Sequence, residues 1–254
     1  MKDNGLLVQY FNANTPADQT LWAKAAKDAA TLKKLGATAV WFPPATKGAA
    51  GKDDRGYAPY DLYDLGEFNQ KGSVGTRYGT KKEYLEAIDA MKAQGINVYA
   101  DIAVRQKLGA DSVEKVTAAD FNAKDIPQMI GNKKIVGALS KFTFPGRKSK
   151  YSKFKWNWNH FAGIDWQQDD FKRRVCELSG MTETEAEKKY KLSKYDYIIG
   201  SELDLYNQEV YDELMAWAKW YEDVTGVDGF RFQEAEKIPG WFIRDFAEAA
   251  SNAG

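Results

Sequence analysis

The chain has 254 residues, 44% apolar and 28% charged, which is enough to build the core of one large or two small domains. Its 36 basic and 36 acidic side chains cancel, which argues against nucleic acid or an anionic membrane as a partner, because either needs clustered basic residues. A single cysteine excludes an internal disulfide, and a single histidine, His160, excludes a zinc site built from several histidines. We expect no membrane span and no signal peptide, because every apolar run is short.

The apolar pattern alternates between strand and helix periods along the chain. In order, it predicts a strand at 6–11, a helix at 18–35, a strand at 38–42, a helix at 80–94 and a strand at 97–104. Further on, it predicts a helix at 209–224, a strand at 227–232 and a helix at 241–250. Four strand–helix units in series predict a parallel sheet with right-handed crossovers, as in an α/β barrel.

The segment 105–207 is too long for a loop between a strand and a helix. It is rich in lysine and aromatic residues, and a structureless loop of this length would be unusual. We therefore predict an inserted, β-rich domain at 105–207. Residues 1–104 and 208–254 would supply the barrel units on either side of it.

Four stretches of the sequence resemble the liquefying α-amylases of bacteria. Residues 56–68 (GYAPYDLYDLGEF) resemble the loop after the second barrel strand of that family, and 97–104 resemble its third strand. Residues 142–158 resemble its inserted domain B, and 227–231 (VDGFR) resemble its fourth strand. The resemblance implies an α/β fold, a partial (β/α)8 barrel of about four units with domain B after strand three. It also implies kinship to hydrolases of α-1,4-glucans, with the site at the carboxyl ends of the strands.

The resemblance places Gln233 where the family has its nucleophilic aspartate, in the pattern Gly-Phe-Arg-x-Asp. A glutamine amide is a very poor nucleophile, and a retaining glycosidase also needs a second carboxyl group as acid and base. The family's other two catalytic carboxylates follow later strands, beyond Gly254, so we expect no intact catalytic set and no hydrolysis by this chain alone. Asp101 and Arg231 stand at supporting positions and are expected to form an ion pair. Glu234 is expected to point away from the side of Gln233, because side chains alternate along a strand.

Several positions are expected to contact an α-glucan. Tyr57 resembles the tyrosine that stacks on a glucose ring in the family, with simple packing as the alternative. Gln106 stands where the family has a substrate-binding histidine. The full predicted set is Tyr57, Asp101, Gln106, Arg231, Glu236 and Lys237.

The structural calcium site of the family is altered in this sequence. Its expected acidic ligands are Asp165, Asp196, Glu202 and Asp204, and Arg105 stands where the family has an asparagine ligand. Lys237 stands where a histidine supplies a carbonyl oxygen. Because a guanidinium repels a cation, we expect Arg105 and Lys237 to neutralise these acids by salt bridges, with retained calcium as the alternative. No other cofactor is expected.

Four parallel strands cannot close a barrel, so the first and fourth strands are expected to have unpaired edges. One hypothesis is an inactive half-barrel, either a pseudoenzyme or a redesigned fragment, that is structural or binds glucan. A second is an amylase completed in trans by a complementary C-terminal half-barrel. A third is a scaffold that self-associates as a homodimer. The sequence leaves these alternatives open.

Overall fold

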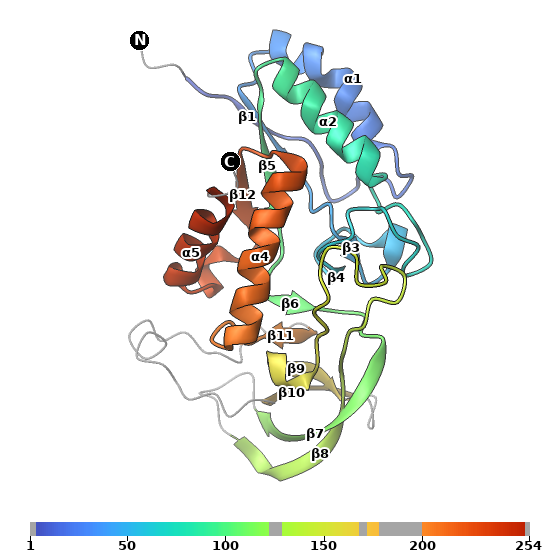
Figure 1. Ribbon diagram of the computed structural model, residues 1–254, viewed down its shortest axis with the longest axis vertical. Coiled ribbons are helices and arrows are strands. Elements are labelled where there is room, and N and C mark those ends of the chain that lie inside the picture. Colours follow the sequence, from blue (N-terminus) through green and yellow to red (C-terminus); the bar gives the residue numbers. More distant parts are fainter. Residues whose placement is uncertain (1–3, 122–128, 168–171, 178–199, 252–254) are drawn as a thin grey trace.

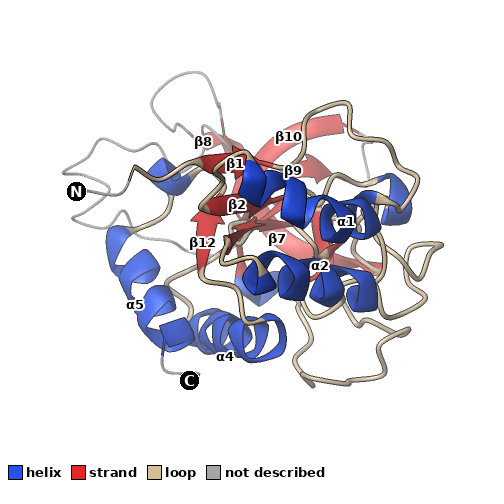
Figure 2. Cartoon of the chain, turned by 90° about the horizontal axis from the view of Figure 1, so that it is seen from above, coloured by secondary structure: helices blue, strands red, loops and turns tan. Residues whose placement is uncertain are grey.

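The computed structural model describes residues 4–121, 129–167, 172–177 and 200–251 (Figure 1). Four parallel strands form one sheet, in the order β1 (Leu7–Gln9), β2 (Ala39–Phe42), β5 (Asn97–Ile102) and β12 (Gly229–Phe232). Each is followed by a helix of the same unit: α1 (Leu21–Lys34), α2 (Lys81–Ala93), α4 (Gln208–Thr225) and α5 (Gly240–Ser251). The partial α/β barrel is confirmed, and these elements begin and end within three residues of the predicted bounds. Figure 2 shows the helices in an arc beside the strands.

Local capping explains where two of the helices begin and end. At the start of α2, the Glu83 carboxylate accepts the Thr80 backbone N–H at 2.8 Å, and the Thr80 hydroxyl accepts the Glu83 N–H at 3.4 Å. The Asn207 side chain caps α4 by accepting the N–H of Glu209 at 2.9 Å. That helix ends at Gly226, whose φ of 61° is in the left-handed region that favours glycine.

Aromatic side chains fill the space between the helices and the sheet. The Trp22 ring of α1 lies 4.7 Å from the Tyr84 ring of α2, centroid to centroid, and 5.3 Å from that of Phe42 on β2. The hydroxyl groups of Tyr84 and Tyr221 are 2.8 Å apart in the buried core, which links α2 to α4. One continuous core therefore joins helices that are far apart in the sequence.

A second sheet lies below the helices in Figure 1. Its six strands, all antiparallel to their neighbours, have the order β6 (Gln106–Lys107), β11 (Ser201–Leu203), β9 (Phe161–Gln167), β10 (Lys172–Glu177), β7 (Ser112–Phe121) and β8 (Met129–Lys141). All six strands fall within the segment predicted as an insertion, although the exact domain limits stay a prediction. In the described residues, no helix combines the length and apolar character that a membrane crossing needs.

A buried lysine anchors the chain after β2. Lys47 belongs to β3 (Lys47–Gly48), which pairs with β4 (Pro59–Asp61) after the short helix η1 (Gly51–Asp53). Its ammonium donates to the backbone carbonyls of Phe68, Ser73 and Val74 at 3.1, 2.7 and 2.6 Å. It also lies 3.4 Å from the Asp64 carboxylate. Burial lowers the pKa of Lys47, and the charge of Asp64 partly offsets that effect.

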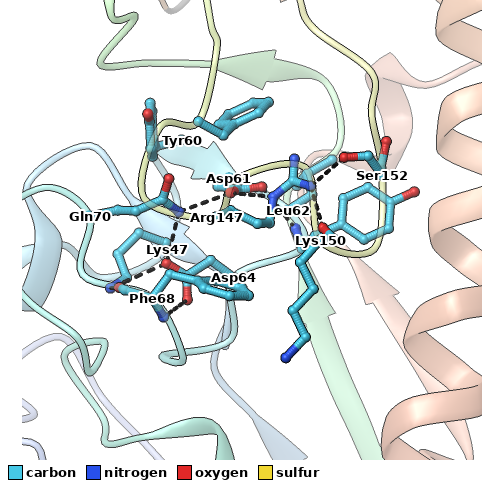
Figure 3. A network of polar contacts seen from close by, with 12 residues as sticks. Lys47, Tyr60, Asp61, Leu62, Asp64, Phe68, Gln70, Arg147, Lys150 and Ser152 are labelled. Carbon is cyan, nitrogen blue, oxygen red and sulfur yellow. Dashed lines mark hydrogen bonds and ion pairs between the residues drawn. The ribbon is translucent and has the colours of Figure 1, made fainter.

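A buried arginine ties the same region to the insertion (Figure 3). The Arg147 guanidinium donates to Asp61 Oδ2 at 2.8 Å and to the carbonyls of Lys150 and Ser152 at 2.5 and 2.7 Å. Both members of the Arg147–Asp61 pair are 1% exposed. The loop around Arg147 is therefore fixed against β4.

Gln70 joins these two charged centres into one network. Its amide nitrogen donates to Asp61 Oδ2 at 2.9 Å and to Asp64 Oδ2 at 3.0 Å (Figure 3). We call Lys47, Asp61, Asp64, Gln70 and Arg147 the Lys47–Arg147 network. Its two cations and two carboxylates balance, as buried charges must.

Removing one charge should break that balance. We expect Arg147→Met to lower the free energy of unfolding by about 3–5 kcal/mol, because it leaves the Asp61 carboxylate buried without its cation. Urea denaturation measures this loss. Lys219→Met is the matched control, since it removes only an exposed pair with Asp223 at 3.3 Å and should cost about 0–1 kcal/mol. Equal losses in the two variants would show that the network does not stabilise the fold.

Candidate functional site

Asp101 lies near the carboxyl end of β5 and is buried. Strand register pairs it with Arg231 of β12, and Arg231 Nη1 is 3.2 and 3.3 Å from the two Asp101 oxygens. The ion pair expected from the sequence is therefore present. The Arg231 side chain is 46% exposed, and its guanidinium lies 4.9 Å from the Trp41 ring centroid. A buried carboxylate thus holds a solvent-facing cation at the end of the sheet.

Tyr57 comes from the loop between η1 and β4 and is held at both ends. Its hydroxyl donates to Asp101 Oδ2 at 2.6 Å, and its backbone carbonyl accepts the Gln106 amide N–H at 3.1 Å. The residue is half-buried. The structure thus brings together four of the predicted residues, Tyr57, Asp101, Gln106 and Arg231, whereas their contact with a glucan stays a prediction.

Burial dominates the electrostatics of this group. It raises the pKa of Asp101 above its ordinary value, while the hydrogen bond from Tyr57 and the charge of Arg231 act in the opposite direction. Burial and the hydrogen bond to Asp101 also raise the pKa of Tyr57, so the phenol keeps its proton as the donor. The three side chains form a fixed polar unit.

Gln233 directly follows β12. Its backbone N–H donates to the carbonyl of Ile102 at 2.9 Å, which continues the strand pairing by one residue. Its side-chain Oε1 is buried and accepts no hydrogen bond from the described part of the chain. An acceptor left in this state costs free energy, and a hydroxyl donor would satisfy it.

Arg105 follows β5 and is buried between two carboxylates. Its Nη1 donates to Glu202 Oε1 at 3.0 Å and its Nη2 donates to Glu234 Oε2 at 2.8 Å. Lys237 Nζ donates to the other Glu234 oxygen at 2.7 Å. Burial raises the pKa of Glu202 to about 7, and Arg105 opposes this shift. For Glu234, the hydrogen bonds and charges of Lys237 and Arg105 outweigh burial and lower its pKa.

Glu234 lies beyond the end of β12, so its side-chain direction does not follow the alternation of a strand. The expectation that it points away from the side of Gln233 assumed a continuing strand, but β12 ends at Phe232 and Glu234 has a φ of 52°. Its position is set by Arg105 and Lys237. Glu236, one of the predicted glucan contacts, is exposed in the short helix η3 (Ala235–Lys237).

Two of the remaining predicted calcium ligands, Asp165 and Asp204, lie in the described part of the chain. Asp165 is half-buried on β9, and its N–H donates to the Gly200 carbonyl at 3.1 Å. Asp204 accepts the Tyr206 N–H at 3.1 Å, and Asp196 lies outside the described residues. Within the described ranges, no three acidic, histidine or cysteine side chains are grouped as metal ligands. Arg105 and Lys237 donate to three of the four carboxylate oxygens of Glu202 and Glu234, and the fourth, Glu202 Oε2, is buried. The two glutamates therefore leave one oxygen for a cation that takes six to eight oxygen ligands, which does not fit calcium.

His160 has a hydrogen-bond partner at each ring nitrogen. Its Nδ1 accepts the Asn157 N–H at 3.1 Å and its Nε2 is 2.9 Å from a Glu209 oxygen. This pattern closes the short helix η2 (Trp158–His160) against the start of α4.

Lys107 is a buried cation that the sequence analysis did not single out. It is 1% exposed, and its ammonium donates no hydrogen bond to the described residues. The rings of Phe142, Phe144 and Trp156 surround it at 5.2, 5.4 and 5.1 Å from Nζ to centroid. Burial lowers its pKa to about 7. The charged groups that also act on it are Asp61, Arg147, Glu213 and Asp111.

Comparison with known proteins shows what the chain is similar to. No protein-family model matches the chain. An α-amylase of Geobacillus stearothermophilus is 45% identical over 244 residues, which cover 96% of this chain and 44% of that protein. The chain is similar to α-amylases over nearly its whole length. An α-amylase of Bacillus licheniformis is 41% identical over 243 residues, which cover 96% of this chain and 47% of that protein. The chain thus spans about half the length of the curated relatives it matches.

Solved structures agree on the fold. An α-amylase of Anoxybacillus superposes with a TM-score of 0.55 at 16% identity, covering 98% of this chain and 44% of that one. The resemblance noted in the sequence is therefore confirmed, together with the partial barrel.

The buried amine of Lys107 should make stability depend on pH. Its pKa in the folded chain, about 7, lies below the ordinary value of 10.5, so the unfolded chain binds more protons between these pH values. The cost of burying Lys107 therefore falls as pH rises through that window. We expect Lys107→Met to raise the free energy of unfolding by about 1–4 kcal/mol near pH ~6 and by less near pH ~9.

Urea unfolding of the native chain and the variant at both pH values measures this difference. Lys82→Met, at a side chain that is 83% exposed, is the control and should show no such trend. A gap between Lys107→Met and the native chain that widens as pH rises would contradict the burial of this amine.

Proposed function

We propose that this chain is the glucan-binding N-terminal part of an α-amylase-type barrel and does not itself cleave the glucan. The observation that carries the proposal is Gln233, which follows the family sequence Gly229-Phe230-Arg231 at the end of β12. Similarity to α-amylases supports α-1,4-glucan as the ligand class. The Asp101–Arg231 pair supports the same end of the sheet as the site.

The chemistry explains why hydrolysis should fail. A retaining glycosidase attacks the anomeric carbon with a carboxylate oxygen and forms a covalent glycosyl–enzyme intermediate. An amide oxygen at Gln233 carries no negative charge and cannot form a stable ester of this kind. Loss of a nucleophile in a catalytic set costs about 10⁴–10⁶ in rate.

The neighbouring Glu234 is a poor replacement. Both of its carboxylate oxygens accept hydrogen bonds, from Arg105 at 2.8 Å and from Lys237 at 2.7 Å. An attacking oxygen must give up such bonds and its paired cations. The ion pairs of Glu234 therefore support a structural role over a nucleophilic one.

Binding can persist without cleavage. The hydrogen bonds at the hydroxyl and carbonyl of Tyr57 hold its ring in one orientation, and a held ring loses little entropy when a sugar stacks on it. The exposed guanidinium of Arg231 offers hydrogen bonds to sugar hydroxyls, whereas the side-chain oxygen of Gln233 is buried. Gln106 contributes by holding Tyr57, while Glu236 and Lys237 extend the proposed site.

Starch binding and starch cleavage are measured separately. We expect the native chain to be retarded in a native gel that contains soluble starch, yet to release no reducing sugar. Tyr57→Ala should weaken binding about tenfold through loss of the ring, whereas Tyr57→Phe keeps the ring and should bind more tightly than Tyr57→Ala. Trp158→Ala, at an exposed aromatic residue outside this group, is the control.

Reducing-sugar release by the native chain would overturn the inactive assignment. Unaltered mobility in starch would overturn glucan binding.

A second proposal concerns the open sheet. In the described residues, β1 pairs with β2 alone and β12 pairs with β5 alone, which leaves one edge of each free. Leu6 and Leu7 at β1 are 45% and 56% exposed. Four more parallel strands would pair with both edges and cover the open face. We propose a complementary C-terminal half-barrel as this partner, with a homodimer as the alternative.

Light scattering after size exclusion tests the partner. We expect a one-to-one complex when the chain is mixed with the separately produced C-terminal half of the Geobacillus stearothermophilus α-amylase. A dimeric mass for the chain alone would favour the homodimer. A monomer under both conditions would refute edge pairing.

A further inference from the structure

We propose that Arg105, assisted by Lys237, is a built-in cation that joins three segments of this chain and makes their junction independent of calcium. The three segments are the end of β5, strand β11 and the turn after β12. They contribute Arg105, Glu202 and Glu234, respectively. Glu202 lies 97 positions after Arg105 in the chain, and Glu234 lies 129 positions after it. This proposal concerns stability and is independent of whether glucan binds.

The guanidinium acts as a fork between the two carboxylates. Nη1 donates to Glu202 at 3.0 Å and Nη2 donates to Glu234 at 2.8 Å, with the Arg105 side chain only 6% exposed. The backbone carbonyl of Arg105 also accepts the Leu203 N–H at 2.8 Å. A planar group with several donors suits this task, because a single ammonium cannot present two divergent N–H groups in a fixed plane.

Lys237 adds a second positive charge to the junction. Its ammonium is 2.7 Å from Glu234, so that among the described residues Arg105 and Lys237 face the carboxylates of Glu202 and Glu234 in a largely buried place. A divalent cation would need six to eight oxygen ligands, and three of the four oxygens of Glu202 and Glu234 already accept N–H donors. Calcium would therefore have to displace Arg105 against its own charge.

The junction also holds a strained turn. Glu234 has a φ of 52°, in the left-handed region that a residue with a side chain seldom adopts. Such a conformation persists where surrounding contacts determine it. Arg105 and Lys237 supply those contacts, because each donates a hydrogen bond to one carboxylate oxygen of Glu234.

Thermal unfolding with and without a chelator tests the proposal. We expect the melting temperature of the native chain to change by less than about 2 °C in excess EDTA or in excess calcium chloride, because no metal ion contributes to the junction. A fall in EDTA, or a rise of several degrees with calcium, would overturn it.

Variants at Arg105 test the fork itself, with all measurements made in EDTA. Arg105→Asn should lower the melting temperature by about 5–15 °C, since it leaves buried carboxylates facing each other. Arg105→Lys should fall between this variant and the native chain, because it keeps the charge but not the fork. Lys219→Met, at an exposed pair, should stay within about 2 °C of the native chain.

If Arg105→Asn does not fold, Lys237→Met is the less disruptive variant, and we expect it to lower the melting temperature by about 2–5 °C. Melting temperatures of the Arg105 or Lys237 variants equal to that of the native chain would refute the junction.

Discussion

Buried charge that must be neutralised within the fold is the constraint on which this structure depends. The Lys47–Arg147 network places two cations and two carboxylates where water cannot solvate them, so each group requires its partners in position. Because Asp61 and Asp64 flank the loop that leads from Tyr57, and Arg147 comes from the insertion, satisfying these charges fixes the two regions together. Tyr57, which precedes Asp61 in the chain, is held by its own hydrogen bond to Asp101.

The site combines preserved positioning with altered chemistry. Tyr57, Asp101 and Arg231 still form a connected polar unit at the carboxyl end of a parallel sheet, where α/β barrels place their ligands. The position next to it carries Gln233, whose side chain can accept a hydrogen bond but offers no anionic oxygen. Recognition and bond cleavage draw on different atoms, so one can be lost while the geometry of the other is retained. That separation is the basis of the function proposed above.

Local signals predicted the barrel units well, because the spacing of apolar residues that marks a helix or a strand acts within a few residues. Register also made the Asp101–Arg231 pair predictable, since equivalent ends of parallel strands lie side by side. Of the two carboxylates that Arg105 binds, the sequence predicted Glu202 but not Glu234. Glu234 lies past the end of β12, where the alternation of side chains along a strand no longer applies. Buried lysines such as Lys47 and Lys107 were missed, because the sequence pattern gives no sign that a lysine will be enclosed.

The pairing of β12 with β5 has a consequence for synthesis on the ribosome. Asp101 meets Arg231 across 130 positions, with the whole insertion emerging between them. During translation, β5 must wait with one edge bare until β12 leaves the exit tunnel. An unpaired strand edge of this kind can pair with a strand of another nascent chain and so lead to aggregation. In the insertion, β7 pairs with β8 and β9 pairs with β10, so these two hairpins can form during that interval, before β12 is available.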